Sequence, residues 1–583
     1  MTMPQPHDEN PCRPRHFKPS PCSPAPLDGP AKQSLDTSHT RLLITAALFC
    51  LAFVVVGLRL VEVAAFKHGD PRLAHRGVAT QPMVSRADIV DRNGVLLATT
   101  LETPSLYADP KQVIDAHDAA RQLVRVLPDL KESEVYAKLT SDKSFIWLKR
   151  QMTPRQEYEV NRLGLPGLQF EDEEKRVYPK GGLAAQAVGF VGLDNHGFAG
   201  VERGLDRVLR SRSAPLALSL DIRLQFILRQ EVAHQVADFN AIGGTGIIMD
   251  VRTGEIMAIV SLPDFDPNAP GAASPEALFN RATLGTYEMG SVFKIFTAAI
   301  ALETHAATMT SGYDATNPIR FGGFTIHDDH AQRRWLSVPE IFTYSSNIGA
   351  AKMALDIGTD RQRDFLGRLG LLRPPAAFEI KELGEPLAPS PWRQINTMTI
   401  GFGQGLSVSE LQLATAAAAV VNGGVLHPAT LVKHAEGDAI LGERIFSEQT
   451  SIEMRKLLRL VVEEGTGKLA NAPGYLVGGK TGTAEKVAGK SYAIHSLLSS
   501  FLGVFPVNDP RFLVLISVDE PHGNTKSHGY ATGGWVAAPA VQQVIERMAS
   551  LVGIQPVDED SPEIRRSLLV TSPTPVGRKF AAN

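Results

Sequence analysis

The sequence predicts a mixed α+β fold, with one N-terminal transmembrane helix and a large body built on an antiparallel sheet covered by helices. Three observations lead to this prediction: one long apolar segment near the N-terminus, pairs of apolar runs joined by polar turns, and stretches with helical spacing of apolar residues. The chain has 583 residues, 43% of them hydrophobic and 21% charged, with a formal net charge of −3. Such a composition is that of a globular protein and excludes collagen, a coiled coil, a wholly disordered chain and a multi-span membrane protein. The absence of a basic excess argues against nucleic acid binding.

The N-terminal region is predicted to be a disordered tail followed by a membrane anchor. Residues 1–40 contain nine prolines and little apolar periodicity. In Leu42–Leu58 the only polar residue is Thr45, and Leu60–Phe66 prolongs the apolar stretch. This length favours a single span over a cleaved secretory signal, which would also not follow forty residues of tail. Positive charges flank the span on both sides, so the positive-inside rule does not assign its orientation.

The next part of the body, about residues 80–230, alternates short apolar runs with Gly, Pro and charged residues. Ile89-Val90, the turn Asp91–Gly94 and Val95–Ala98 together form a hairpin signature. The charged run Glu171–Arg176 is predicted to be a solvated turn.

Residues 240–550 are predicted to form the larger α/β unit. Thr245–Met249 with Glu255–Val260, and Phe501–Phe505 with Phe512–Val518, form two more hairpin signatures. Helices are predicted around Val292, Ile295, Phe296 and Ala299, which have helical spacing, and over Val536–Val552. Hairpins with interspersed helices indicate an antiparallel sheet covered by helices.

Three short patterns follow one another in this larger unit: Ser291-Val292-Phe293-Lys294, Ser345-Ser346-Asn347 and Lys480-Thr481-Gly482-Thr483. A serine hydroxyl is a poor nucleophile without an adjacent base, and a lysine three residues later at a helix start lies on the same face. To act as that base Lys294 must be neutral near pH 7, about 3 units below the ordinary pKa of a lysine, which burial and a second cation can achieve. Lys480 is the candidate for the second cation, so this hypothesis requires both lysines in one pocket.

The three patterns differ in specificity. S-x-x-K and S-x-N each occur about once or twice by chance in a chain of this length, and either alone is more often an exposed helical pair or a capping serine. K-T-G is rarer, at roughly once in ten such chains. Their common order and spacing therefore favour a nucleophilic serine.

The trio resembles the signature of the serine acyl transferases that recognise penicillin. Further segments resemble the class B penicillin-binding proteins, in their non-catalytic pedestal and in a glycine-rich stretch between the second and third motifs. These segments are Arg86–Gly94, Arg176–Pro179, Gly189–Gly200, Glu202 and Gly401–Gly405. Met289 and Ala87 stand where many relatives carry Pro and Gly, and neither change removes a reacting group. The similarity covers about residues 40–550 and is strongest to the cell-division branch of class B.

The resemblance implies five parts. These are a disordered cytoplasmic tail (1–40), a transmembrane anchor (41–66), an elongated pedestal domain of the dimerisation type (67–235), the transpeptidase domain (236–552) and a flexible C-terminal tail (553–583). Since peptidoglycan lies outside the inner membrane, the large part is expected in the periplasm.

The resemblance also implies a reaction, D,D-transpeptidation of peptidoglycan. Ser291 would attack the penultimate D-Ala of a stem pentapeptide, Lys294 would take its proton, and Ser345 would relay a proton to the departing D-Ala. Asn347 would contact Lys294 and the donor peptide, and Lys480 would maintain the charge state of the relay. The implied substrate-binding strand is Thr481, Gly482 and Thr483, with the two threonines gripping the substrate carboxylate and the backbone N–H groups of Ser291 and Thr483 forming the oxyanion hole.

A neighbouring strand's amine would then attack the acyl-enzyme, and β-lactams would trap Ser291. No cofactor and no metal are expected. The implied partners are the FtsW glycan polymerase and other divisome proteins, besides the two peptidoglycan strands.

Several alternatives stay open. An elongation enzyme, a D,D-carboxypeptidase or a β-lactamase would use the same trio, and a silent scaffold would not need it. Gly474–Thr481 also satisfies the phosphate-loop pattern of ATPases, although Asn471-Ala472-Pro473 precedes it where an apolar strand is required. His327-Asp328-Asp329-His330 contains four potential metal ligands but is predicted to be a polar loop at the mouth of the site.

Overall fold

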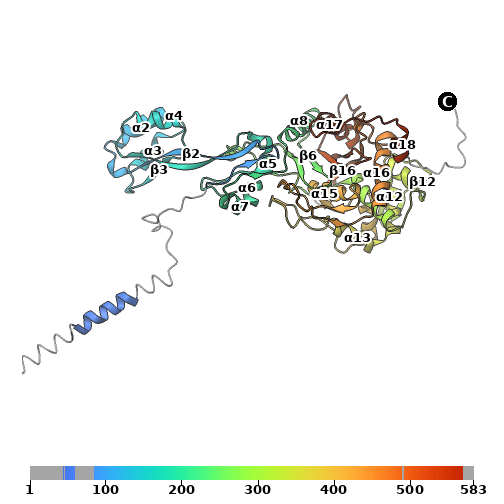
Figure 1. Ribbon diagram of the computed structural model, residues 1–583, viewed down its shortest axis with the longest axis horizontal. Helices are drawn as coiled ribbons and strands as arrows, with labels where there is room; N and C mark the ends of the chain where they lie inside the picture. The colour runs from blue at the N-terminus through green and yellow to red at the C-terminus, as the bar shows by residue number, and fades with distance from the viewer. Residues whose placement is uncertain (1–43, 45, 59–84, 489–490, 569–583) are drawn as a thin grey trace, which may run out of the picture. The chain divides into compact units, whose positions relative to one another are not determined.

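The computed structural model describes residues 44, 46–58, 85–488 and 491–568. The chain divides into two compact units, Met1–Met83 and Val84–Asn583. In the first unit residues 46–58 are helical (Figure 1). Within the described residues, no helix combines the length and hydrophobicity that crossing a membrane requires. The predicted tail at 1–40 lies outside the described residues, as do both ends of the predicted anchor at 41–66, so both stay predictions.

The second unit begins with the segment predicted to be the pedestal. Its elements, in chain order, are β1 (Ile89–Val90), β2 (Leu96–Ala108), η1 (Pro110–Gln112), α2 (Ala116–Val126), α3 (Glu132–Leu139), β3 (Ile146–Lys149), α4 (Pro154–Asn161), β4 (Leu168–Val177), η2 (Gly181–Ala184), α5 (Ala185–Val188), α6 (Gly200–Gly204), α7 (Asp206–Ser211) and β5 (Leu216–Ala217). The long strand β2 pairs with β1, β3 and β4, and β1 also pairs with β5 in parallel.

The predicted hairpin at the start of the pedestal is confirmed. Ile89 pairs with Ala98 and Val90 with Leu96 in antiparallel register. The turn is held by Asp91, whose Oδ1 accepts hydrogen bonds from the backbone N–H groups of Asn93 and Val95, both at 2.8 Å. An aspartate that binds the backbone two and four residues on is a common way of stabilising such a turn.

The prediction of a turn at Glu171–Arg176 is wrong, because these residues belong to β4. They pair with β2 in a continuous antiparallel register from Leu168 to Val177. Most side chains of this strand remain accessible to solvent and only Arg176 is buried. A strand with an accessible face can carry charges at low cost, so the charged run did not signal a turn.

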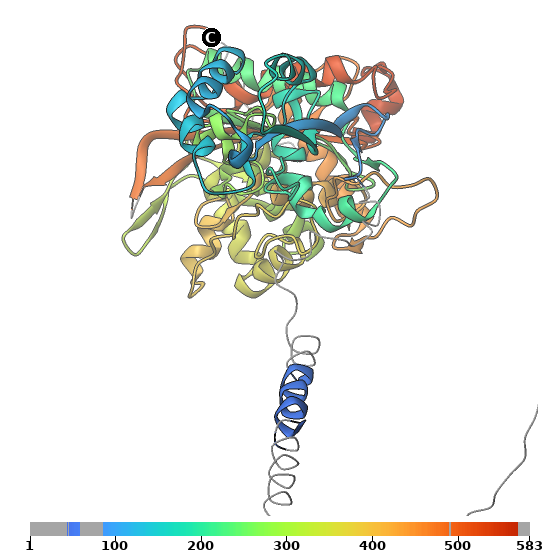
Figure 2. The same ribbon diagram turned by 90° about the vertical axis from the view of Figure 1, so that its left-hand side faces the viewer.

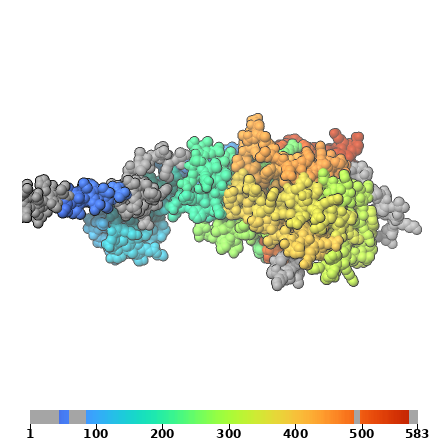
Figure 3. Space-filling model, turned by 90° about the horizontal axis from the view of Figure 1, so that it is seen from below, coloured from blue at the N-terminus to red at the C-terminus, as the bar shows by residue number. Residues whose placement is uncertain are grey.

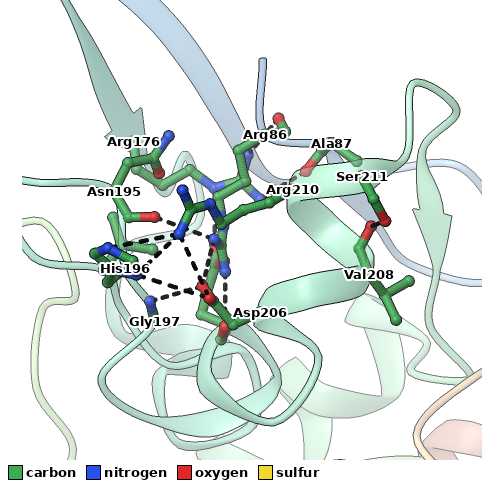
Figure 4. A network of polar contacts seen from close by, with 12 residues as sticks. Arg86, Ala87, Arg176, Asn195, His196, Gly197, Asp206, Val208, Arg210 and Ser211 are labelled. Atoms are coloured by element: carbon green, nitrogen blue, oxygen red, sulfur yellow. Dashed lines mark hydrogen bonds and ion pairs between the residues drawn. The ribbon is translucent and has the colours of Figure 1, made fainter. Parts of the chain in front are cut away.

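A buried ionic network joins the pedestal segments that resemble family motifs. The two oxygens of the Glu202 carboxylate accept from Arg86 Nε at 2.5 Å and from Arg176 Nε at 2.7 Å, and all three side chains are fully buried. Arg86 also reaches Asp206 at 2.7 Å. Figure 4 shows that contacts from His196, Gly197 and Arg210 also meet at Asp206. The Glu202 carboxylate therefore connects three segments that are distant in sequence. These buried charges stabilise the fold only while the carboxylate and both guanidinium groups are present, since an unpaired buried charge is destabilising.

The catalytic part follows with a larger set of elements. They are α8 (Ile222–Asp238), β6 (Gly243–Asp250), β7 (Ile256–Leu262), η3 (Pro270–Ala272), α9 (Pro275–Leu278), β8 (Tyr287–Glu288), η4 (Gly290–Phe293), α10 (Lys294–Glu303), β9 (Gly312–Asp314), β10 (Ile319–Phe321), β11 (Phe324–Ile326), β12 (Trp335–Ser337), α11 (Val338–Thr343), α12 (Asn347–Ile357), α13 (Thr359–Arg368), α14 (Gln394–Ile400), β13 (Ser407–Val408), α15 (Glu410–Val421), β14 (Val425–Leu426), β15 (Glu443–Arg444), α16 (Glu448–Glu463), η5 (Lys468–Ala470), β16 (Gly478–Ala488), β17 (Ser491–Phe505), β18 (Phe512–Asp519), α17 (Gly533–Met548) and α18 (Pro562–Leu568).

A five-stranded antiparallel sheet of order β16-β17-β18-β6-β7 forms the centre of this part. It contains both predicted hairpins, β6–β7 and β17–β18, so these predictions are confirmed. Helices α8 and α17 cover one face, and α15, backed by α10, covers the other (Figure 1). Successive side chains of β6 pack on opposite faces of the sheet. Ile247 and Met249 belong to the apolar cluster on one face, and Ile248 belongs to the cluster on the other. Figure 2 shows the β16–β17 hairpin (orange) extending beyond the helices.

The two predicted helices of the catalytic part are present with shifted ends. Val292, Ile295, Phe296 and Ala299 are all buried in the turn η4 and the helix α10. The predicted helix over Val536–Val552 begins earlier and ends earlier, as α17 (Gly533–Met548).

The segment after residue 553, predicted to be a flexible tail, makes specific contacts with the rest of the unit up to Glu559. The N–H of Val557 donates to Gly474 O at 2.8 Å, and Ile554 packs against the apolar cluster under α17. Glu559 forms an ion pair of 2.6 Å with Arg459, whose side chain is only 4% exposed. A buried guanidinium requires a carboxylate partner, and this segment supplies a second one besides Glu463 of α16, which pairs with Arg459 at 2.8 Å. Residues 569–583 lie outside the described residues.

The base of the pedestal packs directly against the catalytic part. Ala87, Ile89 and Leu97 belong to the same apolar cluster as the core of the catalytic part. Arg203 of α6 forms an ion pair of 3.1 Å with Glu382. In Figure 3 the surface near residue 200 (green) lies against the yellow surface of the catalytic part. The pedestal base and the catalytic part therefore share one continuous core.

Candidate active site

Ser291 lies on a tight turn that only glycine permits. Gly290 has φ +51°, and a Cβ on it would lie 2.6 Å from the carbonyl oxygen of Thr483 on β16. Its N–H donates to the carbonyl of Gly403 at 3.1 Å, within the predicted glycine-rich stretch. The turn η4 passes directly into α10, so Ser291 and Lys294 lie on the same face of the helix start.

The amine of Lys294 is the centre of the site. Its Nζ lies 2.9 Å from Ser291 Oγ, 2.6 Å from the carbonyl oxygen of Ser345, 3.1 Å from Ser345 Oγ and 2.7 Å from Asn347 Oδ1. Lys294 is buried. The structure therefore brings the predicted nucleophile, the predicted base and the S-x-N motif into one cluster.

Ser345 lies between the two lysines. Its Oγ is 3.1 Å from Lys294 Nζ and 3.0 Å from Lys480 Nζ. The residue has φ +58°, a left-handed conformation that costs a residue other than glycine about 1–3 kcal/mol. Surrounding contacts must hold this conformation, and it places the carbonyl and the hydroxyl of one residue on the same amine.

Lys480 reaches the site from β16 and is completely buried. Besides Ser345 its Nζ contacts the carbonyl of Thr481 at 3.3 Å, and it lies 6.0 Å from the centre of the Phe342 ring. Both lysines therefore occupy one pocket, as the hypothesis required.

The two amines titrate below the range of an ordinary lysine. Burial lowers the pKa of Lys294 to about 7, although the negative charges of Asp328 and Asp329 oppose this shift. Burial also lowers the pKa of Lys480, and the positive charge of Lys294 lowers it further. Burial is thus the main cause for both groups. Near neutral pH the Lys294 amine can accept the proton of Ser291.

The strand β16 brings the predicted substrate-binding residues past the turn of Ser291. Thr481 Oγ1 lies 2.7 Å from Thr466 Oγ1, and Thr483 Oγ1 accepts from the N–H of Gly533 at 3.1 Å. A Cβ on Gly482 would lie 2.3 Å from Ser500 Oγ and 2.9 Å from the carbonyl of Met289, so this glycine permits the close approach of the strand to the turn.

Two residues around the site were missed from the sequence: Thr466 and Gly533. They fix the orientation of the two threonines, and a Cβ on Gly533 would lie 2.4 Å from Gly482 O. Neither lies in a recognisable motif, so no local signal could identify them. Only the packing of the sheet brings them to the site.

The two rival site predictions are answered by the same geometry. A phosphate loop requires a helix directly after its lysine. Here Lys480 lies inside the strand β16, which continues to Ala488. Among the residues that the structure describes, no three His, Cys, Asp or Glu side chains are gathered as a metal site would require. Asp328 instead accepts hydrogen bonds from Ser346 Oγ and from the N–H of Ile348, and His327 O accepts from Asn347 Nδ2.

Two family models match this chain. The model of the penicillin-binding protein transpeptidase domain matches residues 244–546, and the model of the penicillin-binding protein dimerisation domain matches residues 82–214.

Curated relatives match over nearly the whole length. The chain is 40% identical to the probable peptidoglycan D,D-transpeptidase FtsI of Caulobacter vibrioides, covering 89% of this chain and 90% of that protein. It is 35% identical to the probable peptidoglycan D,D-transpeptidase PenA of Neisseria meningitidis, covering 89% and 94%. It is 30% identical to the peptidoglycan D,D-transpeptidase FtsI of Escherichia coli, covering 88% and 92%.

Solved structures share the fold. Penicillin-binding protein 3 of Mycobacterium tuberculosis, complexed with aztreonam, has a TM-score of 0.64 at 24% identity, covering 82% of this chain and 98% of that one. A peptidoglycan synthetase of Bifidobacterium adolescentis has a TM-score of 0.64 at 22% identity, covering 83% and 98%.

Proposed function

This chain belongs to the class B penicillin-binding proteins, and on that premise we propose that it cross-links peptidoglycan as a D,D-transpeptidase through an acyl-enzyme on Ser291. The observation that carries the proposal is the distance of 2.9 Å between Ser291 Oγ and the buried amine of Lys294. The lowered pKa of that amine, about 7, supports its role as the base.

Acylation begins with transfer of the Ser291 proton to Lys294 Nζ. The Oγ then attacks the carbonyl carbon of the penultimate D-Ala of a stem pentapeptide, and a tetrahedral oxyanion forms. The N–H groups of Ser291 and Thr483 are proposed to stabilise it, each donor contributing about 3–4 kcal/mol. The close approach of Gly290 to the Thr483 carbonyl supports this pairing of backbones.

Release of D-Ala requires a proton on its amine as the C–N bond breaks. Ser345 Oγ, within 3.1 Å of both amines, is placed to donate its proton to the leaving group and to recover one from Lys294. Lys480 Nζ lies 3.0 Å from Ser345 Oγ and is proposed to maintain the charge state of this relay. Asn347 Oδ1 holds Lys294 at 2.7 Å and thereby keeps the base in position.

Deacylation completes the cross-link when the amine of a second stem peptide attacks the Ser291 ester. A D,D-carboxypeptidase or a β-lactamase would differ only in using water at this step. The names of the relatives and the dimerisation-type pedestal favour transfer to an amine. Incubation with a stem pentapeptide and an acceptor amine should give cross-linked product, and free tetrapeptide alone would support the hydrolytic alternatives.

Labelling by a fluorescent penicillin tests the nucleophile. The wild-type chain should carry one adduct, which peptide mass mapping should locate on Ser291, and Ser291→Ala should abolish it. Ser211→Ala, which changes an exposed serine of α7, is the matched control and should label as wild type. Labelling that survives in Ser291→Ala would defeat the assignment.

The arrangement in the cell is part of the proposal. The apolar segment 41–66 would anchor the chain in the inner membrane, with residues 1–40 in the cytoplasm, the pedestal at 67–235 and the transpeptidase domain at 236–552 in the periplasm. Helical residues 46–58 support the anchor. A fusion of alkaline phosphatase after residue 552 should be active, since that enzyme requires export, and an inactive fusion would contradict this topology.

A role in septum synthesis, with the FtsW glycan polymerase and other divisome proteins as partners, follows from the similarity to proteins named FtsI. Depletion of the chain should produce filamentous cells, because growth continues while septa do not form. Rounded cells would instead assign the chain to elongation.

A further inference from the structure

One buried acid beside the site has no part in the proposed reaction. Asp328 follows β11, and only 8% of its surface is exposed. Its Oδ2 accepts from Ser346 Oγ at 2.8 Å and its Oδ1 from the N–H of Ile348 at 2.9 Å. Hydrogen bonds to a charged acceptor are among the stronger ones in proteins. Both oxygens of the carboxylate are therefore committed to the start of α12.

These hydrogen bonds hold the catalytic S-x-N segment from behind. Ser346 lies between Ser345 and Asn347, both of which contact the Lys294 amine. The carbonyl of His327 accepts from Asn347 Nδ2 at 3.0 Å, so two consecutive loop residues hold the segment. Since Ser345 has a strained φ of +58°, its position depends on such neighbours.

The charged groups that act on the Lys294 amine lie on one loop. Asp328 and Asp329, between β11 and β12, are negative and raise the pKa of Lys294, whereas burial and Lys294 lower the pKa of the neighbouring Lys480 amine well below its usual range. The other elements around the pocket contribute neutral groups, such as the Asn347 amide of α12 and the Phe342 ring of α11. Asp329 is exposed while Asp328 is buried, so water and salt screen Asp329 more strongly.

We propose that Asp328 is a positioning residue of the acylation step, which holds the Ser345–Asn347 segment against the Lys294 amine and places a fixed negative charge beside it. The proposal rests on the transpeptidase function proposed above. Its two effects are separable. The hydrogen bonds set the rate when the amine is free base, and the charge sets the pH at which the amine loses its proton.

The charge is tested by the pH dependence of acylation of the full-length chain. The second-order rate constant for a fluorescent penicillin is measured between about pH 5 and 9, where it reports the groups of the free enzyme. Asp328→Asn keeps the shape and removes the charge, so the midpoint of the acid limb should move down by about one pH unit. The ratio of the rate at about pH 6 to that at about pH 8 should then rise about fivefold. The matched control Asp329→Asn should move the midpoint clearly less.

The hydrogen bonds are tested by variants that keep the charge. Ser346→Ala removes one bond to Asp328 and should lower the rate at about pH 8 by roughly tenfold, with the midpoint of the acid limb unchanged. Asp328→Glu keeps the carboxylate but displaces it, and should likewise lower the rate without moving the midpoint. If Asp328→Asn does not fold, these two variants still decide whether Asp328 holds the segment.

The opposite results are equally clear. Equal midpoints for Asp328→Asn and Asp329→Asn would overturn the electrostatic effect. Wild-type rates in both Ser346→Ala and Asp328→Glu would overturn the holding of the segment. A wild-type chain that is not acylated at any pH would overturn the transpeptidase proposal itself, which distinguishes that failure from a failure of the inference on Asp328.

Discussion

Lys294 illustrates how one buried side chain acquires its chemistry. An amine in water holds its proton to high pH, whereas burial lowers the pKa of Lys294 to about 7. Four oxygen contacts within 3.1 Å then fix its direction. The combination of a lowered pKa and a fixed geometry suits Lys294 to its proposed role as the base for Ser291.

The wild-type chain should lose acylation as the pH falls below about 7, because the protonated Lys294 cannot accept the Ser291 proton. The decline should approach tenfold per pH unit in the acid range. Lys294→Met should lose about 10²–10⁴-fold at every pH, as expected for removal of a general base. Stopped-flow labelling with a fluorescent β-lactam measures both, and a flat profile between about pH 5 and 8 would contradict the assignment of the base.

A second buried group, Glu410 at the start of α15, titrates in the opposite sense. It is fully buried, and the hydroxyls of Ser517 and Thr245 lie close enough to its carboxyl to oppose the effect of burial. Burial raises its pKa from 4.5 to about 7, and the negative charge of Asp519 adds to the rise. Between these values the folded protein keeps a proton that the unfolded chain has lost. Stability is therefore lost as the pH rises through about 7.

Glu410→Gln should remove this loss. The variant should match or approach wild type near pH 4.5 and exceed it above about pH 7 by up to about 3 kcal/mol, the equivalent of the pKa shift. Melting temperatures measured across this range test it, with Glu436→Gln, an exposed glutamate, as the control. A difference between variant and wild type that does not grow with pH would contradict the buried, protonated state of Glu410.

The turn before α10 and the glycine-rich stretch before β13 act as one element. Gly403 has φ +90°, and a Cβ on it would lie 1.9 Å from the carbonyl of Gly290, beside the nucleophile. Any side chain at this position must displace the turn that carries Ser291. The close contact of two backbone segments therefore fixes the nucleophile more firmly than either segment could alone.

Gly403→Ala should combine backbone strain with displacement of that turn. We expect at least about a hundredfold slower acylation, since misplacement of a reacting group by 1 Å can cost about that factor. Gly423→Ala is the matched control, because Gly423 has φ +94° but open space around a Cβ. That control should lose about 1 kcal/mol of stability and keep its acylation rate. Equal acylation rates in the two variants would contradict the coupling of Gly403 to Ser291.

Across the whole second unit, the pedestal base and the catalytic part are built as one body. The buried ion pairs of Glu202 connect the segments of the pedestal base to one another. The apolar cluster that contains Ile89 and Leu97 continues into the core of the catalytic part. At the junction, a Cβ on Gly204 of α6 would lie 1.6 Å from the carbonyl of Glu379. Backbone thus packs on backbone between the two parts, which leaves little room for independent movement there.

Gly204→Ala should force this junction apart and lower the melting temperature by several degrees, in line with overpacking costs of about 1–3 kcal/mol. Gly271→Ala, at a position with nothing within 4 Å of a Cβ, is the control and should be close to neutral. Differential scanning fluorimetry measures both. A Gly204→Ala variant as stable as its control would show that the junction is loosely packed.

The local patterns of the sequence were sufficient for the hairpins, the helix of Ser291 and the family. Hairpins such as β6–β7 and β17–β18 are encoded by alternation and turn residues within short windows, and the three motifs are contiguous. The sequence-based expectations differed from the structure where solvent exposure and long-range contacts, rather than the local residue pattern, determine the conformation. The charges of β4 lie on an accessible face, and the segment after residue 553 makes contacts with residues far away in the sequence, among them the ion pair of Glu559 with the buried Arg459.

The sequence by itself was sufficient to predict the candidate site residues, because the proposed nucleophile, the two amines and the amide belong to short contiguous motifs. Such motifs can be recognised without knowledge of the fold. Only the tertiary structure decided that they meet. Ser345 and Lys480 are 135 residues apart, and only the placing of strand β16 beside the turn between α11 and α12 brings Lys480 Nζ to 3.0 Å from Ser345 Oγ. The same packing excludes water from both amines and lowers their pKa values. Burial and long-range proximity are properties of the packed chain as a whole, so no short window of residues contains them.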